Sequence, residues 1–230
     1  MEKKYILTDE TIEYLGHTLH RIKAVKDFAT ISAGTLGGYV ESETNLDHTG
    51  AAWVYENAKV SENAKVYGDA KVSGDAWVSE NARVSGDAWV YENARVYGDA
   101  WVYGDAKVSG DAWVSGDARV SGDAWVSGDA KVYGDAWVSG NAWVTGDAMV
   151  TGDAMVRETS DIALIKGFGS KLRATSFFRC VDGLVRCQCG CFYGTVDEFR
   201  SKVRETHGNS KYAKEYLMIA DLMELHFKED

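Results

Sequence analysis

Valine recurs at every sixth residue from Val54 to Val156, which makes eighteen consecutive hexads without a slip. An alanine stands two residues before each of these valines, from Ala52 to Ala154. Within each A-x-V-x segment the apolar side chains alternate, so Ala and Val point to one face of a short strand and their neighbours point to the other. The pattern therefore predicts eighteen short strands with a continuous Ala/Val core.

Two turn-forming residues follow each strand, either Gly with Asp or Asn, or Glu with Asn. Gly and Asn tolerate positive φ, so we predict that whichever of them is present adopts this conformation at the corner. Four strand residues and two corner residues, repeated three times, close a coil of 18 residues. The eighteen hexads thus predict a mainly β chain, with a parallel β-helix of about six coils over residues 52–157.

The outward residue before each valine defines three ladders, because residues 18 apart stack in such a coil. The first reads Trp53, Lys71, Trp89, Lys107, Trp125, Trp143. The second reads Lys59, Trp77, Arg95, Trp113, Lys131, Met149. The third reads Lys65, Arg83, Trp101, Arg119, Trp137, Met155. Alternating aromatic and basic rungs predict cation–π contacts of ~0.5–1 kcal/mol each at exposed sites. Because the alternation runs around all three faces, it favours surface stabilisation over a local binding site.

The hexads resemble those of the hexapeptide-repeat family over their whole length, and this resemblance implies a left-handed parallel β-helix. Residues 22–28, 33–40 and 53–58 also resemble the start of bacterial hexapeptide-repeat proteins that are classed as transferases without an established reaction, and of phage and prophage proteins. Acyltransferases of this family use a catalytic histidine beside an extruded loop, so the resemblance raises the hypothesis of a coenzyme A-dependent acyltransferase.

The repeat itself contains neither a histidine nor an extruded loop. The histidines all lie outside it: His17, His20, His48, His207 and His226. A general base must lie within reach of a substrate, and only His48 is near the first coil. We therefore predict no catalytic residue and no cofactor, and favour a non-enzymatic protein.

The ends of a β-helix expose apolar core and need caps. Residues 1–51 contain short strand patterns and predict an N-terminal β cap, and residues 52–162 form the helix. Residues 163–230 predict a small α+β domain: a β-hairpin over 173–180 and 184–192 with its turn at Asp182-Gly183, then helices over 196–206 and 211–227. Thr195 and Ser210 are the expected helix caps.

Pairing across a two-residue turn places Phe178 and all four cysteines on one hairpin face, where the thiols fit a small core better than a zinc site, given their C-x-C-x-C spacing. We therefore predict no metal. The opposite face and the residues before it offer basic, polar and aromatic side chains for an acidic protein partner or, less well supported, nucleic acid. These candidate partner-binding residues are Lys171, Arg173, Phe177, Arg179, Arg186 and Gln188.

The formal charge of −10 falls mostly on the repeat, which argues against wrapping nucleic acid around it. No apolar run is long enough to span a bilayer, and the N-terminus lacks the apolar core of a signal peptide, so we expect a cytoplasmic protein without a membrane contact. The leading hypothesis is a scaffold or interaction protein, phage- or prophage-encoded, that recognises its partner through the C-terminal domain. An acidic decoy that imitates nucleic acid is a further alternative, and a homo-oligomer, such as the trimer common in the family, is left open.

Overall fold

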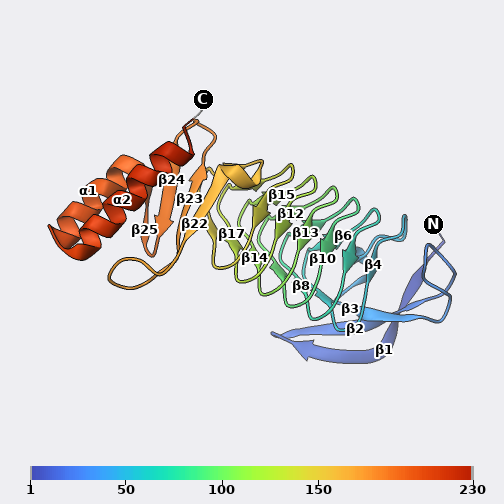
Figure 1. Ribbon diagram of the computed structural model, residues 1–230. Helices are drawn as coiled ribbons and strands as arrows, with labels where there is room; N and C mark the ends of the chain where they lie inside the picture. Colours follow the sequence, from blue (N-terminus) through green and yellow to red (C-terminus); the bar gives the residue numbers. More distant parts are fainter. Residues whose placement is uncertain (1, 229–230) are drawn as a thin grey trace.

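The computed structural model describes residues 2–228. Figure 1 shows three parts in line: an N-terminal β-hairpin, a column of stacked coils, and a C-terminal sheet covered on its outer side by two helices. The column is a parallel β-solenoid, as the hexads predict. Its handedness stays a prediction.

Three parallel sheets form the faces of the column, because strands three hexads apart are hydrogen-bonded neighbours. One face consists of β4 (Trp53–Val54), β7 (Lys71–Val72), β10 (Trp89–Val90), β13 (Lys107–Val108), β16 (Trp125–Val126) and β19 (Trp143–Val144). The second face contains β5 (Lys59–Val60), β8 (Trp77–Val78), β11 (Arg95–Val96), β14 (Trp113–Val114), β17 (Lys131–Val132) and β20 (Met149–Val150). The third contains β6 (Lys65–Val66), β9 (Arg83–Val84), β12 (Trp101–Val102), β15 (Arg119–Val120), β18 (Trp137–Val138) and β21 (Met155–Val156). This register confirms the three predicted ladders rung by rung.

The solenoid has about seven turns, because an incomplete coil precedes the regular hexads. Strand β3 (Leu36–Val40) pairs in parallel with β5, with Val40 opposite Val60, and Leu46 forms a parallel bridge to Val66. A short 3-10 helix, η1 (Glu43–Asn45), joins these two positions. The imperfect hexads before residue 52 thus begin the stack, and residues 47–51 absorb the shift in spacing.

The solenoid core is a narrow column of alanine and valine. Every repeat Ala and Val is at most 1% exposed. Backbone N–H and C=O groups form hydrogen bonds between neighbouring coils. For example, Trp89 N donates to Ala106 O and Tyr91 N donates to Val108 O, both at 2.9 Å. Each coil therefore depends on its neighbours for both hydrogen bonds and core contacts, and the two end coils need covers.

The N-terminal cover is an antiparallel ribbon of β1 (Tyr5–Tyr14) and β2 (His17–Ala24), which joins the solenoid through β3. It buries Trp53 completely, although this rung occupies an outward position. Tyr5 and Phe28 contact the Trp53 ring, with centroids at 6.2 and 5.4 Å. Gly37 is required where the ribbon meets the stack, because a Cβ there would lie 2.6 Å from Val54 O.

The corners differ from the prediction in which residue takes positive φ. The first corner residue does so throughout: glutamate at Glu56, Glu62, Glu80 and Glu92 has φ of 54–62°. The prediction that Asn supplies this conformation is therefore wrong. The Glu92 carboxylate accepts a hydrogen bond from the backbone N–H of Gly110, one coil further on, at 2.6 Å. This bond offsets the ~1–2 kcal/mol cost of left-handed backbone in a residue with a Cβ.

We predict an order of stability at this corner. Glu92→Ala keeps the left-handed strain and loses the hydrogen bond to Gly110. Its free energy of unfolding should therefore be about 1 kcal/mol lower than that of the wild type. Glu92→Gly loses the bond but also removes the strain, so it should lie close to wild type. Chemical denaturation of the three proteins measures this order, and an Ala variant as stable as the Gly variant would contradict it.

The C-terminal unit is an antiparallel sheet in chain order with two helices packed on it. A 3-10 turn η2 (Thr159–Asp161) leads into β22 (Ile162–Ile165), which is followed by β23 (Thr175–Arg179), β24 (Val185–Cys189), β25 (Phe192–Thr195), α1 (Val196–His207) and α2 (Lys211–His226). Thr195 Oγ1 accepts from Glu198 N, and Ser210 Oγ accepts from Ala213 N, which confirms both predicted helix caps. Neither helix is long and apolar enough to cross a membrane within residues 2–228.

The hairpin register differs from the prediction by one residue. Phe177 pairs with Cys187 and Phe178 pairs with Arg186, because three residues rather than two form the loop. Cys180 N donates to Leu184 O, and Gly183, with φ of 81°, closes a turn onto Cys180 O. A shift of one residue moves a side chain to the opposite face, so Phe178 does not share a face with Cys187.

This register makes the C-terminal sheet the cover of the solenoid's last coil. Phe178 and Cys180 belong to the Ala/Val core, whereas Phe177 and Cys187 belong to a second core with the helices. Polar contacts fix the junction at Asp153, which accepts a hydrogen bond from the Tyr193 hydroxyl at 2.9 Å and lies 3.4 Å from the Arg186 guanidinium. The C-terminal unit thus packs directly against the last coil through a shared apolar core and polar contacts.

Candidate interaction groove

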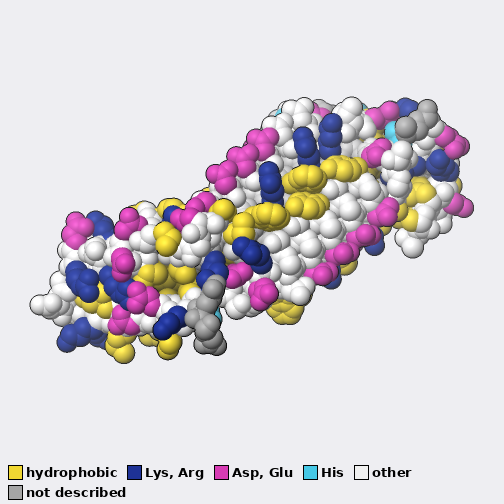
Figure 2. Space-filling model, turned by 90° about the horizontal axis from the view of Figure 1, so that it is seen from above, with side chains coloured by type: hydrophobic (Ala, Val, Ile, Leu, Met, Phe, Trp, Pro, Cys, Tyr) yellow, Lys and Arg dark blue, Asp and Glu magenta, His cyan; other side chains and the backbone are white. Residues whose placement is uncertain are grey.

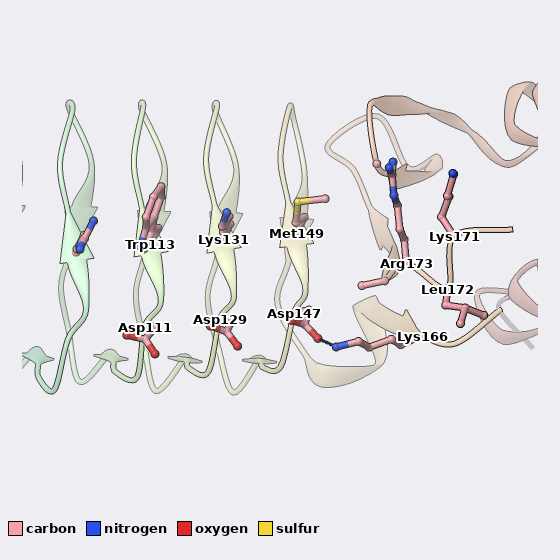
Figure 3. A pocket seen from close by; sticks show the side chains of 13 residues that line it. Asp111, Trp113, Asp129, Lys131, Asp147, Met149, Lys166, Lys171, Leu172 and Arg173 are labelled. Atoms are coloured by element: carbon pink, nitrogen blue, oxygen red, sulfur yellow. Dashed lines mark hydrogen bonds and ion pairs between the residues drawn. The ribbon is translucent and has the colours of Figure 1, made fainter. Parts of the chain in front are cut away.

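An open groove of about 740 Å³ lies where one solenoid face meets the C-terminal unit (Figure 3). Its solenoid wall is the face of β11, β14, β17 and β20, and its other wall is the segment 166–174 that leads from β22 to β23. Because β20 also contacts β23 through a bond from Met149 N to Ser176 Oγ at 2.8 Å, the two walls are held together.

Trp113 stands on the solenoid wall with a cation on each side along its ladder. The Arg95 guanidinium lies 5.3 Å and the Lys131 ammonium 4.7 Å from the indole ring. These are the predicted cation–π contacts, and within the ladders of residues 2–228 they are found at this tryptophan alone. The Trp113 ring therefore holds one pair of cations, Arg95 and Lys131, on its two sides.

The sequence predictions do not include a second use of the ladder tryptophans, through their indole N–H groups. Five of them donate this N–H to the serine sixteen residues earlier, at distances of 2.9–3.1 Å. The pairs are Trp77–Ser61, Trp89–Ser73, Trp101–Ser85, Trp125–Ser109 and Trp137–Ser121. The signal was in the sequence, because the residue after each valine lies beside the tryptophan of the next coil.

Trp113 departs from this pattern, because the residue sixteen positions earlier is Tyr97, which contacts the indole edge-on at 6.3 Å. Its indole nitrogen therefore has no hydrogen-bond acceptor within the described chain, and the residue lines the open groove. The rung thus offers a ligand one N–H donor between two cations.

A row of corner carboxylates borders the groove below these rungs: Asp111, Asp129 and Asp147. Figure 2 shows that acidic side chains run in rows along the solenoid's corners, with hydrophobic and basic side chains on the face between them. Lys166 forms an ion pair with Asp147, as the dashed line in Figure 3 shows. Asp111 accepts a hydrogen bond from the Asn93 amide at 3.2 Å and keeps its second oxygen as an acceptor at the border. The Asp129 carboxylate is also an acceptor there.

The overhanging segment presents Lys171, Leu172 and Arg173 to the groove. Leu172 is 62% exposed and has φ of 52°, an uncommon conformation for a residue with a branched apolar side chain. Gly169 anchors the segment, because its N–H donates to the Glu215 carboxylate at 2.9 Å. The bond from Gly169 thus helps to fix the segment that carries Lys171 and Arg173 at the groove.

The six candidate partner-binding residues do not form one surface. Phe177 is buried under the helices, and Gln188 is buried with its amide donating to Gly190 O at 2.7 Å. Arg179 forms an ion pair with Asp161 at 3.1 Å, and Arg186 forms one with Asp182. The hydrogen bonds that the Arg186 guanidinium donates to Asp182 are the main reason why the pKa of Arg186 is raised. The structure leaves Lys171 and Arg173 exposed, and both line the groove.

The cysteines divide between two environments. Cys180 and Cys187 are buried, and burial raises the pKa of the Cys180 thiol to about 11 and that of Cys187 further. Cys189 is half-buried and Cys191 is exposed. Within residues 2–228, no three His, Cys, Asp or Glu side chains are grouped closely enough to hold a metal ion.

His48 is already engaged by the N-terminal ribbon. Its ring stacks on Tyr5 at 4.4 Å, and its Nδ1 accepts a hydrogen bond from Lys4 N at 3.3 Å. Burial lowers the pKa of His48, and a neutral ring with an occupied Nδ1 lone pair carries its proton on Nε2. His48 therefore has no free lone pair for a substrate, so the geometry does not favour its use as a general base.

Comparison with known proteins agrees with the repeat architecture. The family model described as the YdcK beta solenoid repeat matches residues 90–104 and 112–128. This chain is a β-solenoid repeat protein. The match falls within the regular coils that carry Trp113 and its flanking ladder. No curated protein matches this β-solenoid.

Proposed function

We propose that this β-solenoid is a non-enzymatic scaffold that binds a partner protein through an acidic segment laid in the groove at its C-terminal junction. The observation that carries the proposal is the set of four cations that line the groove: Arg95 and Lys131 beside Trp113, and Lys171 and Arg173 on the opposite wall. A phage or prophage setting and a cytoplasmic location remain part of this hypothesis.

Charge supports an acidic occupant. None of the four groove cations has a carboxylate within ion-pair distance in the described part of the chain, in contrast to Lys166, Arg179 and Arg186. A chain of formal charge −10 repels acidic partners in general. A local group of unpaired cations therefore selects where such a partner can be held.

The shape and chemistry of the groove support a peptide segment. An open groove admits an extended chain, and tryptophan and arginine are enriched among residues that dominate binding energy at interfaces. The Trp113 N–H, Asp111 and Asp129 can hydrogen-bond with backbone groups, while the cations meet acidic side chains. A rigid solenoid wall positions these groups before binding and so reduces the entropy that binding costs.

Photocross-linking of the full-length protein tests this proposal. A benzophenone amino acid at position 131 should capture a discrete partner in cells of the source organism, whereas the same group at position 107 should not. Lys131 and Lys107 are matched, since both lie beside ladder tryptophans, at Trp113 and Trp89, on different faces. Identical adducts from both positions, or none from position 131, would contradict the proposal.

Charge reversal then measures the contribution of the groove to binding of the captured partner. Arg95→Glu with Lys131→Glu should weaken binding about tenfold or more, because both attractive charges become repulsive. The control, Lys71→Glu with Lys107→Glu, reverses the two cations around Trp89 and should leave affinity unchanged. Equal losses in both variants would indicate non-specific electrostatics and defeat the groove as the site.

A further inference from the structure

We infer that the C-terminal unit contains a second site, which binds a small organic anion with an apolar body. The site is a cavity of about 360 Å³ between β25 and the two helices, and the 166–174 segment lines it together with the solenoid groove. Cavities that bind small molecules measure ~300–1,000 Å³, so this one suits a compact ligand and excludes a folded or polymeric one.

The interior of the cavity is apolar and rigid. Phe199 and Val203 of α1 are buried, and the Phe199 ring contacts Phe192 and Tyr216 with centroids at 5.7 and 5.6 Å. Tyr216 is buried as well, and His207 stacks on it at 5.7 Å. A flat ring or a short alkyl chain can therefore bury its apolar surface against side chains that are already in place, at ~0.8 kcal/mol per buried methylene group.

The rim of the cavity is basic. Three cations line it, with a histidine and two hydroxyl groups: Lys171, Arg173, Lys202, His207, Ser170 and Thr206. No aspartate or glutamate among residues 2–228 lines it, although the chain has 35 acidic residues. Lys202 donates to Glu205 at 2.9 Å, but Glu205 lies outside the cavity and is exposed, so this pair is weak.

The apolar interior and the basic rim together determine the class of ligand. An apolar interior alone would accept any hydrophobic molecule, whereas a rim of cations without carboxylates selects one bearing a carboxylate, sulfonate or phosphate group. Partial negative charge on the last carbonyls of α1 disfavours an anion beside His207. The anionic group therefore belongs at Arg173 and Lys202.

The anion site can be tested separately from the groove proposed above, although the two share cations. Lys171 and Arg173 line both the groove and the cavity, but Lys202, Val203 and Thr206 line the cavity and not the groove. Substitutions at Lys202 and Thr206 therefore test the anion site, and substitutions at Arg95 and Lys131 test the groove.

Fluorescence titration of the full-length protein with anilinonaphthalene sulfonate tests the inference. The dye should bind with a saturable signal, octanoate should displace it, and octyltrimethylammonium, which has the same chain and the opposite charge, should not. Lys202→Glu should weaken dye and octanoate binding about tenfold. Lys214→Glu, at an exposed position on α2 that lines neither site, should match wild type.

A second variant tests the cavity by volume rather than charge. Thr206→Trp places a large ring at the exposed rim without altering the buried residues, so it should abolish octanoate displacement while thermal unfolding stays at the wild-type temperature. Equal displacement by octanoate and octyltrimethylammonium, or unchanged affinity in both Lys202→Glu and Thr206→Trp, would overturn the inference.

Discussion

Phe178→Ala is expected to cost about 3–5 kcal/mol of unfolding free energy, the usual range for removing a buried phenylalanine. Phe178 is 0% exposed and belongs to the same core as the solenoid's Ala and Val residues. Its removal leaves a void between β23 and the last coil, so the core at β20 and β21 loses part of its cover. Hydrogen exchange should therefore accelerate over the final hexads, about residues 137–156, as well as in β23.

Phe177→Ala is the matched control, because the neighbouring residue is equally buried and lies in the other core. Phe177 contacts Phe199 edge-on at 5.8 Å, so its loss should loosen α1 and α2 from the sheet. Exchange should then accelerate in the helices while the last coils stay protected. The same exchange pattern in both variants would contradict the assignment of the two rings to separate cores.

The solenoid could be predicted from the sequence because its physics is local and periodic. Ala and Val at a fixed spacing determine which side chains enter the core, and the constant hexad length determines which rungs stack. The spacing therefore predicts Arg95, Trp113 and Lys131 in one ladder, in the order that β11, β14 and β17 confirm. The incomplete coil at Val40 and Leu46 was less evident, since an insertion before residue 52 interrupts the spacing.

The hairpin could not be placed as securely, because a single loop residue determines its faces. Asp182-Gly183 suits a two-residue turn, but the observed loop has three residues and puts Gly183 at its positive-φ position. The resulting shift separates Phe177 from Gln188 and takes both out of the candidate surface. The separation of Phe177 from Gln188 in the candidate site follows from this one difference.

The sequence predicts the binding residues on one wall of the groove, the segment 166–174, but not the position of the other wall. Lys171 and Arg173 were candidates for partner binding because they are basic residues beside a hairpin. The tryptophan ladder, by contrast, looks uniform around the column, and nothing in an 18-residue period shows which rung lies beneath the segment 166–174. The replacement of serine by Tyr97 was the one local irregularity that marked Trp113.

Lys4 is a feature of the N-terminal cover that the sequence did not reveal. Its side chain is 1% exposed, and its ammonium group donates to Ala52 O at 2.8 Å and lies 3.3 Å from Thr49 O. It also lies 5.1 Å from the Phe28 ring. A lysine thus satisfies carbonyl groups in the segment that joins the incomplete coil to the regular repeat. Burial lowers the pKa of Lys4 to about 8, although Asp47 raises it in part.

This shift predicts that alkaline pH stabilises the wild-type protein relative to Lys4→Met. An unfolded lysine has a pKa of ~10.4, so between about pH 8 and 10 the unfolded chain holds a proton that the folded chain has released. The free energy of unfolding therefore rises with pH in this window and is nearly insensitive to this group below it. From about pH 7 to about pH 9.5 the expected gain over Lys4→Met is ~2 kcal/mol.

Urea denaturation of both proteins at several pH values measures this gain as a difference, so other titrating groups cancel. Tyr5 is one such group, because burial raises its pKa, and its effect opposes that of Lys4 only above about pH 10. Lys214→Met, at an exposed lysine, is the control and should follow the wild-type profile throughout. A wild-type advantage that is constant or shrinks between neutral and alkaline pH would show that Lys4 keeps its proton. In that case the carbonyl groups and Asp47 compensate fully for the loss of hydration.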